Sequence, residues 1–215
     1  AKTDDKIKAT LDFFTKVKDT DPLFFSKNPT LLERLKKFNE LDTRYLAHEL
    51  FNKDWKPMSI IELSEYLTET KVSYAASAYY LDAIDILNFS GEQVAVLNSL
   101  PSGIRLEAYK DIMVNQTFRR DFWVKGPIRL DENERFNRFL DKWVVMVCDI
   151  NDIDFKVSGV RGEADLQREI YEPIIDQFKK AGPVKLKDAF SNLSNTHSVK
   201  QFCQAIIILV GNKHF

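Results

Sequence analysis

Residues 45–67 read YLAHELFNKDWKPMSIIELSEYL, and they set the pattern for the first half of the chain. Apolar residues at helical spacing precede a break at Trp55-Lys-Pro57, because proline cannot continue a helix. After the break, Ser59 and Glu62 have the spacing of a capping box, in which the two side chains satisfy free amides at a helix start. The stretch therefore predicts short amphipathic helices joined by sharp turns.

The same pattern extends in both directions as far as Gly126. Apolar residues recur every three or four positions between lysines and aspartates, and Ser90–Gln93 forms a second capping box. The helices expected from this periodicity cover residues 7–17, 30–41 and 104–118. Residues 72–81 are rich in small side chains and fit either a short strand or a buried helix.

Beyond Gly126-Pro127, strand-like and helical segments alternate. The composition favours strands at residues 143–148 and 154–158. Helices are expected within residues 129–140, 166–178 and 197–210, with a short extended piece at 184–186. Helix, short strand, helix, helix is the order of a winged-helix module, here without its wing. We therefore expect a mainly α protein with a minor α+β part, comprising a helical domain (residues 1–126) and a winged-helix-like C-terminal region (residues 127–215).

The balance of charges argues against nucleic acid or an anionic membrane as a partner. The 215 residues include 31 Lys plus Arg and 32 Asp plus Glu, and neither predicted part is strongly charged. A long-range attraction to a polyanion needs a basic surface. The longest apolar runs have six residues, whereas about 20 are needed to span a bilayer. With no apolar signal region at the start, the chain is expected to be cytoplasmic.

Glycine is scarce, and its spacing excludes several kinds of nucleotide site. The chain has seven glycines, and no two of them are separated by a single residue. A glycine-rich loop under a pyrophosphate or an adenosine ribose needs G-x-G, and a P-loop needs Gly-Lys-Ser/Thr. We therefore expect no self-contained dinucleotide, nucleotide or S-adenosylmethionine site. The start at Ala1, without an initiator methionine, suggests a piece of a longer protein.

The motifs that could carry catalysis or bind a metal are incomplete. His48-Glu49 begins a zincin motif, but Asn52 stands where the second histidine is needed. His48 is then either a hydrogen-bonding residue on a helix face or part of a binding pocket. No G-x-S-x-G elbow marks a serine nucleophile. Cys148 and Cys203 lie in apolar runs and are expected to be reduced, buried thiols. We assign no catalytic, cofactor-binding or metal-binding residue to this chain.

The densest mixture of aromatic and basic side chains is Phe118-Arg-Arg-Asp-Phe-Trp123. Such a mixture can clamp an anionic or flexible partner. Alternatively, an arginine–aspartate network closes the end of the preceding helix over an aromatic core. Because successive helical side chains diverge by about 100°, we expect one of Arg119 and Arg120 to be structural and the other exposed.

Six blocks of the chain follow one another in an order shared with a known family. They are Leu23–Pro29, Tyr45–Pro57, Ile61–Leu67, Lys71–Ala78, Ser90–Gln93 and Asn115–Gly126. Together they resemble the methyltransferase regulatory domain of bacterial class I S-adenosylmethionine-dependent methyltransferases, a group that includes protein-lysine methyltransferases acting on an outer-membrane protein. Ala76 replaces a glycine that is usual in the family. Residues 127–215 resemble the C-terminal region of the same proteins at fewer points.

The resemblance implies that the parent protein is a methyltransferase whose S-adenosylmethionine-binding domain lies upstream of this region. The chain would be its non-catalytic regulatory or substrate-positioning part. Its partners would be that catalytic domain, a protein substrate and a second copy of the protein. The family-typical residues carry over as candidate interface or substrate-side positions: Tyr45, His48, Glu49, Trp55, Arg119, Arg120 and Asp121.

Tyr45 and Trp55 flank the proline break at Pro57 and are expected to be buried, because large aromatic residues often anchor such turns. The alternative function is a stand-alone interaction module with a winged-helix-like end; a small enzyme of unrecognised type is a third reading.

Overall fold

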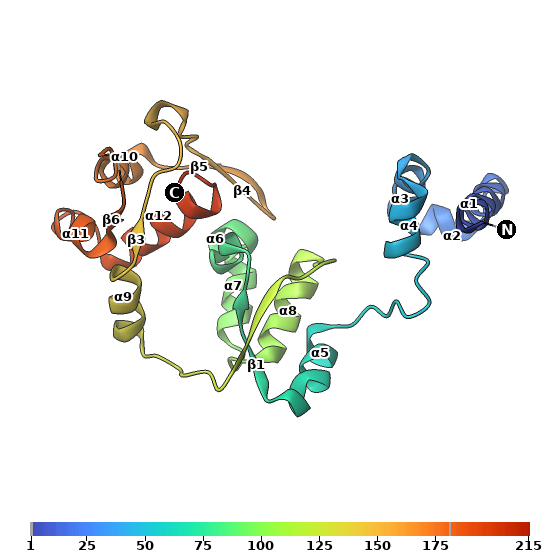
Figure 1. Ribbon diagram of the computed structural model, residues 1–215, viewed down its shortest axis with the longest axis horizontal. Helices are drawn as coiled ribbons and strands as arrows, with labels where there is room; N and C mark the ends of the chain where they lie inside the picture. Colours follow the sequence, from blue (N-terminus) through green and yellow to red (C-terminus); the bar gives the residue numbers. More distant parts are fainter. Residues whose placement is uncertain (1, 181) are drawn as a thin grey trace. The chain divides into compact units, whose positions relative to one another are not determined.

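The computed structural model describes residues 2–180 and 182–215, and the chain divides into two compact units, residues 1–57 and 58–215. Helices predominate, and the strands form small two-stranded antiparallel sheets (Figure 1). The expected fold class, mainly α with a minor β part, is confirmed. The winged-helix-like end and the domain boundary at Gly126 stay predictions. Among the described residues, no helix is both long enough and apolar enough to cross a bilayer.

The first unit is helical throughout. Its helices are α1 (Thr3–Asp19), α2 (Leu23–Lys27), α3 (Pro29–Glu40) and α4 (Thr43–Glu49). Helix α1 packs against α3 and α4. Among the described residues of this unit, the buried hydrophobic side chains are Ile7, Phe25 and Leu46. The core of this unit is therefore small, and several of its aromatic rings remain at the surface.

The prediction that Tyr45 and Trp55 are buried was wrong. Their exposed fractions are 53% and 55%. On α4 the buried position is Leu46, and the neighbouring Tyr45 is rotated by about 100° away from it. Trp55 lies beyond the end of α4, in the irregular segment that leads to Pro57. Neither ring anchors the turn.

The second unit begins with α5 (Ile60–Leu67), which has the capping box predicted from the sequence. The Ser59 hydroxyl oxygen accepts a hydrogen bond from the Glu62 amide at 3.2 Å, and the Glu62 carboxylate accepts one from the Ser59 amide at 2.8 Å. A 3-10 turn, η1 (Thr68–Thr70), then leads into strand β1 (Val72–Ser77). The ambiguous stretch 72–81 is therefore a strand, followed by the 3-10 helix η2 (Tyr80–Ala83).

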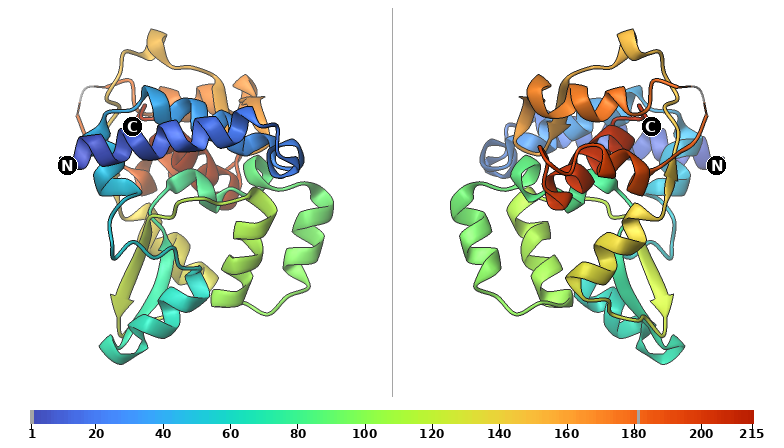
Figure 2. Two further views of the ribbon diagram at one scale, coloured as in Figure 1. Left: turned by 90° about the vertical axis from the view of Figure 1, so that its right-hand side faces the viewer. Right: turned by 90° about the vertical axis from the view of Figure 1, so that its left-hand side faces the viewer.

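Strand β1 pairs with a strand that lies about fifty residues further along the chain. The intervening helices are α6 (Asp85–Asn88), α7 (Gly91–Asn98) and α8 (Ile104–Val114), and strand β2 (Asp121–Lys125) follows them. The register places Val72 opposite Lys125 and Ser77 opposite Asp121, with an irregularity between Tyr74 and Ala76. Figure 2 shows β1 and β2 side by side, and we call this strand pair the β1–β2 ribbon. Helix α5 packs beside it.

Helix α8 ends earlier than the sequence pattern predicts. It stops at Val114 rather than Phe118, and Asn115 adopts the left-handed conformation with φ 51°. Asparagine tolerates this conformation and commonly closes helices. The chain is thereby released before Arg119 and approaches β2 in a non-helical conformation.

The C-terminal part of the second unit contains the largest hydrophobic core. Its elements are α9 (Glu132–Leu140), β3 (Trp143–Val144), η3 (Ile150–Asp152), β4 (Lys156–Gly159), β5 (Gly162–Asp165), α10 (Arg168–Asp176), β6 (Val184–Lys185), α11 (Leu186–Ser191) and α12 (Val199–Gly211). Strand β3 pairs with β6 and β4 with β5, so the strand expected at residues 143–148 is paired over two residues only. Helix α12 provides many of the buried side chains, including Phe202, Ile206 and Leu209.

Residues 81–87 belong to this C-terminal core although they lie far from it in sequence. Leu81, Ile84 and Leu87 are buried in the same cluster as the side chains of α10 and α12. Two glycines permit the close approach. A Cβ atom at Gly159 would lie 2.4 Å from the Leu87 carbonyl oxygen, and one at Gly211 would lie 2.5 Å from a Leu81 methyl carbon. The η2–α6 segment is thus fixed between the β1–β2 ribbon and the C-terminal elements.

Candidate functional site

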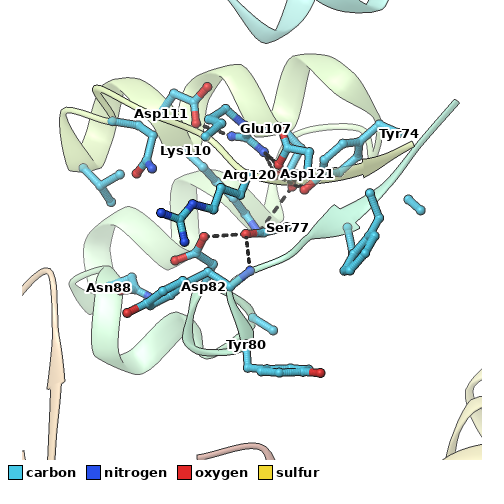
Figure 3. Close-up of a pocket in the computed structure, with 18 of the residues that line it drawn as sticks. Tyr74, Ser77, Tyr80, Asp82, Asn88, Glu107, Lys110, Asp111, Arg120 and Asp121 are labelled. Carbon is cyan, nitrogen blue, oxygen red and sulfur yellow. Dashed lines mark hydrogen bonds and ion pairs between the residues drawn. The ribbon is translucent and has the colours of Figure 1, made fainter. Parts of the chain in front are cut away.

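A cavity of about 670 Å³ lies beside the β1–β2 ribbon in the second unit (Figure 3). Its wall is built by β1, η2, α8 and β2, with side chains from α9 and α12 completing it. We call it the ribbon cavity. Elements distant in sequence meet here because β1 and β2 are paired and because Leu81, Ile84 and Leu87 are buried in the C-terminal core.

Arg119 is the centre of the polar network in this cavity. Its Nε donates to Asp121 Oδ2 at 2.9 Å, and its Nη2 donates to the other Asp121 oxygen at 3.0 Å. The same guanidinium donates to Glu107 Oε2 at 3.3 Å and to Asp111. Tyr74 donates its hydroxyl to Glu107 Oε2 at 2.8 Å, and its ring centroid is 5.6 Å from the guanidinium carbon. The network joins both strands of the ribbon to α8.

The network is largely shielded from solvent, and this shifts the pKa values of its members. The side chains of Arg119 and Asp121 are 20% and 4% exposed. Burial and the hydrogen bond to Glu107 raise the pKa of the Tyr74 phenol. Burial also raises the pKa of Asp111, while the nearby Arg119 opposes this effect. Desolvation alone lowers the pKa of Arg119, but its hydrogen bonds and charge interactions with Asp121 and Asp111 outweigh it and raise that pKa.

The two adjacent arginines divide as the sequence predicted. Arg119 is partly buried in the network, whereas Arg120 is exposed. The physical reason differs from the predicted one, because the pair does not lie on a helix. It lies in the non-helical segment that leads into β2, and Arg119 is engaged there by carboxylates that Arg120 does not reach. Arg119 also binds carboxylates on α8 rather than the carbonyl groups at the end of that helix.

The seven candidate positions separate into two sets. Arg119, Arg120 and Asp121 line the ribbon cavity of the second unit. The other four belong to the first unit and have exposed side chains: Tyr45, His48, Glu49 and Trp55. Their role as interface or substrate-side residues stays a prediction.

Sequence reasoning missed several polar residues of the cavity. The Ser77 hydroxyl donates to Asp82 Oδ2 at 2.6 Å and accepts from the Tyr79 amide at 3.1 Å. Glu107 and Lys110 come from the predicted helix at 104–118, but nothing in its periodicity marks them as site residues. For Ser77 the signal was the run of small residues around Ala76, which pointed to close packing and not to a polar site.

Among the described residues, the cysteine thiols and the possible metal ligands do not form a metal site. The structure places no three His, Cys, Asp or Glu side chains of the described residues where they could share a metal ion. Both cysteines are free; Cys203 is buried, as expected, whereas Cys148 is only partly buried. Burial raises the pKa of Cys203 to about 11. Cys148 Sγ lies 3.7 Å from His214 Nδ1, and burial raises its pKa as well.

Comparison with known proteins identifies the region that builds much of this site. Residues 42–125 match the family described as the predicted methyltransferase regulatory domain. Over 208 residues the chain is 30% identical to the uncharacterised protein sll1526 of Synechocystis sp., covering 96% of this chain and 41% of that protein. Its fold is similar to that of PKMT2 from Rickettsia typhi, with a TM-score of 0.52 at 16% identity, covering 86% of this chain and 40% of that one. The chain thus spans about two fifths of the length of each relative. The match over residues 42–125 confirms the resemblance to the methyltransferase regulatory domain, and the resemblance of residues 127–215 stays a prediction.

Proposed function

We propose that this chain, which carries a methyltransferase regulatory domain at residues 42–125, is the non-catalytic, substrate-positioning part of an S-adenosylmethionine-dependent methyltransferase. The cofactor would be bound by a catalytic domain outside this chain. Methyl transfer depends on holding the acceptor in line with the sulfonium methyl group and on excluding water. A helical region beside a cofactor domain can serve both purposes.

The observation that supports a non-catalytic role is the engagement of the acidic groups around Arg119. Glu107, Asp111 and Asp121 all have hydrogen-bond or ion-pair partners in the network. The raised pKa of Tyr74 keeps its phenol protonated, so that it acts as a hydrogen-bond donor. The hydrogen bonds and ion pairs of these side chains join both strands of the β1–β2 ribbon to α8, which supports a structural role for the network.

The finer organisation belongs to the same proposal. Residues 1–126 would be the regulatory domain and residues 127–215 a winged-helix-like region, in a cytoplasmic bacterial protein. The exposed side chains of the first unit, Tyr45 and Trp55 among them, offer aromatic surface for a catalytic domain, a protein substrate or a second copy. On the second unit, Arg120 lines the ribbon cavity, and among the described residues its guanidinium has no hydrogen-bond or ion-pair partner.

Calorimetry with S-adenosylmethionine tests the proposal. The ligand is titrated into the 215-residue chain and, in parallel, into the full-length parent protein. We expect binding to the parent and none to the chain, because the chain has no G-x-G turn to hold the cofactor. Micromolar binding to the isolated chain would show that it contains a cofactor site and would overturn the non-catalytic assignment.

A further inference from the structure

We propose that the ribbon cavity binds the head group of an α-amino acid, with Arg120 holding its carboxylate and Asp82 its ammonium group. The inference goes beyond the proposed function and rests on the cavity alone. Both side chains line the cavity, together with Ser77 and several aromatic rings.

The charged side chains of the cavity fall into an engaged set and a free set. Lys110 Nζ lies 3.6 Å from Glu107 Oε1, so it belongs to the network around Arg119. Arg120 lies outside this network. Among the described residues its guanidinium makes neither a hydrogen bond nor an ion pair, and its contact is with the Phe118 ring, 5.8 Å away. Arg120 therefore keeps its five N–H donors for a ligand. Arg135 of α9 lines the cavity as a further positive charge without an ion pair among the described residues.

Asp82 is fixed in direction and keeps a free acceptor. Its Oδ2 accepts the Ser77 hydroxyl at 2.6 Å, and Ser77 is itself held by the Tyr79 amide. Within the described part of the chain, the second carboxylate oxygen, Oδ1, has no hydrogen-bond partner. An oriented carboxylate with one open oxygen suits an ammonium or another N–H donor.

Arg120 and Asp82 face each other without pairing. Figure 3 shows the ends of the two side chains next to each other, and among the described residues no ion pair joins them. The backbone fixes this arrangement, because the Ala78 amide donates to the Arg120 carbonyl oxygen at 2.7 Å. A ligand with one charge would leave the other side chain unpaired. A carboxylate and an ammonium on the same carbon satisfy both with charge-assisted hydrogen bonds.

The remaining wall has room for the rest of such a ligand. A volume of about 670 Å³ falls in the range of small-molecule sites, which is about 300–1,000 Å³. Tyr80, Phe122 and Phe139 supply apolar surface for a side chain. The same head group occurs in free amino acids and in S-adenosylmethionine and S-adenosylhomocysteine, so the test must separate these sources.

The test screens the twenty L-amino acids and S-adenosylhomocysteine against the full 215-residue chain by thermal shift. The best amino acid is then titrated by calorimetry, alongside its N-acetyl derivative, which lacks the ammonium, and its amide, which lacks the carboxylate. We expect the free amino acid to bind at least about tenfold more tightly than either derivative, since each loses one charged hydrogen bond. The proposal would be overturned if none of the twenty amino acids and no S-adenosylhomocysteine bound at a ligand concentration of about 10 mM, at which even a weak, millimolar complex would form.

Two variants connect the binding to the named residues. Arg120→Ala should weaken the free amino acid about tenfold or more but leave its amide unaffected. Asp82→Asn keeps an acceptor for Ser77, and it should weaken the free amino acid but leave the N-acetyl form unaffected. Matched controls are Arg105→Ala on α8 and Asp154→Asn, which are exposed and do not line the cavity. Equal affinity in the cavity variants and the wild type would refute the assignment.

S-Adenosylhomocysteine separates the two sources of the head group. If it binds with the same dependence on Arg120 and Asp82, and more tightly than any free amino acid, the head-group site is supported and the cofactor is its source. That result would also contradict the proposed function, which places the cofactor site outside this chain. Binding of a free amino acid alone supports the head-group site and leaves the proposed function intact. S-Adenosylhomocysteine binding that ignores both substitutions, with no amino acid bound, would refute the head-group site.

Discussion

Removing the guanidinium of Arg119 should destabilise the second unit strongly. Arg119→Met preserves much of the side-chain volume but leaves Asp111 and Asp121 without their guanidinium partner, and only Glu107 keeps a cation, Lys110, beside it. The side chain of Asp121 is 4% exposed and those of Glu107 and Asp111 about one fifth, so water compensates only in part. Removing one partner of a buried ion pair costs about 3–5 kcal/mol. We expect a loss in this range, towards its lower end because Arg119 is 20% exposed.

The assay is urea denaturation followed by the fluorescence of Trp123. This residue lies on β2, and its ring centroid is 5.8 Å from that of Tyr74. Replacing the exposed Trp55 and Trp143 by phenylalanine leaves Trp123 as the single tryptophan of the chain. The signal then reports on the ribbon and not on the first unit, whose unfolding need not coincide with it.

Two further variants serve as controls for Arg119→Met. Arg105→Met on α8 removes an exposed arginine and should change the free energy of unfolding by less than about 0.5 kcal/mol. Arg119→Lys keeps the charge but loses the planar fork that reaches several carboxylates, so it should fall between the wild type and Arg119→Met. If Arg119→Met costs less than about 1 kcal/mol, or no more than Arg105→Met, then the network does not hold the ribbon and the reasoning is refuted.

Three shorter predictions concern other parts of the structure. Burial raises the pKa of Asp111, so its carboxyl stays protonated to a higher pH in the folded state than in the unfolded state. The free energy of unfolding of the wild type, relative to that of Asp111→Asn, should therefore fall as pH rises through the raised pKa. Urea titrations from about pH 4, near the usual aspartate pKa, to neutrality check this, and a rise would contradict it. An aromatic disulfide reagent should label Cys148 before the buried Cys203, and equal rates in the folded protein would be the contrary result. Gly159→Ala places a Cβ 2.4 Å from a carbonyl oxygen of α6 and should lower the free energy of unfolding by about 1–3 kcal/mol. Gly91 has open space around it, so Gly91→Ala should leave the stability unchanged. Similar melting temperatures for the two variants would contradict the packing argument.

Local sequence determined where many of the helices begin. The capping boxes at Ser59 and Ser90 are present as predicted, because each depends on hydrogen bonds between residues three positions apart. The order of the family blocks likewise identified the methyltransferase regulatory domain. One prediction about the site also held: one of the paired arginines is structural and the other is exposed.

Only the tertiary structure decided the ribbon, the cavity and the burial of the aromatic rings. Residues 72–77 are a strand because they pair with residues 121–125, and the partners of Arg119 come from α8 as well as from β2. Tyr45 and Trp55 are exposed because burial depends on which neighbours reach a side chain, a property that apolar composition does not define. Caps and turns depend on hydrogen bonds between near neighbours in the chain. The cavity depends on contacts between segments tens of residues apart, and a single sequence does not show which of those contacts form.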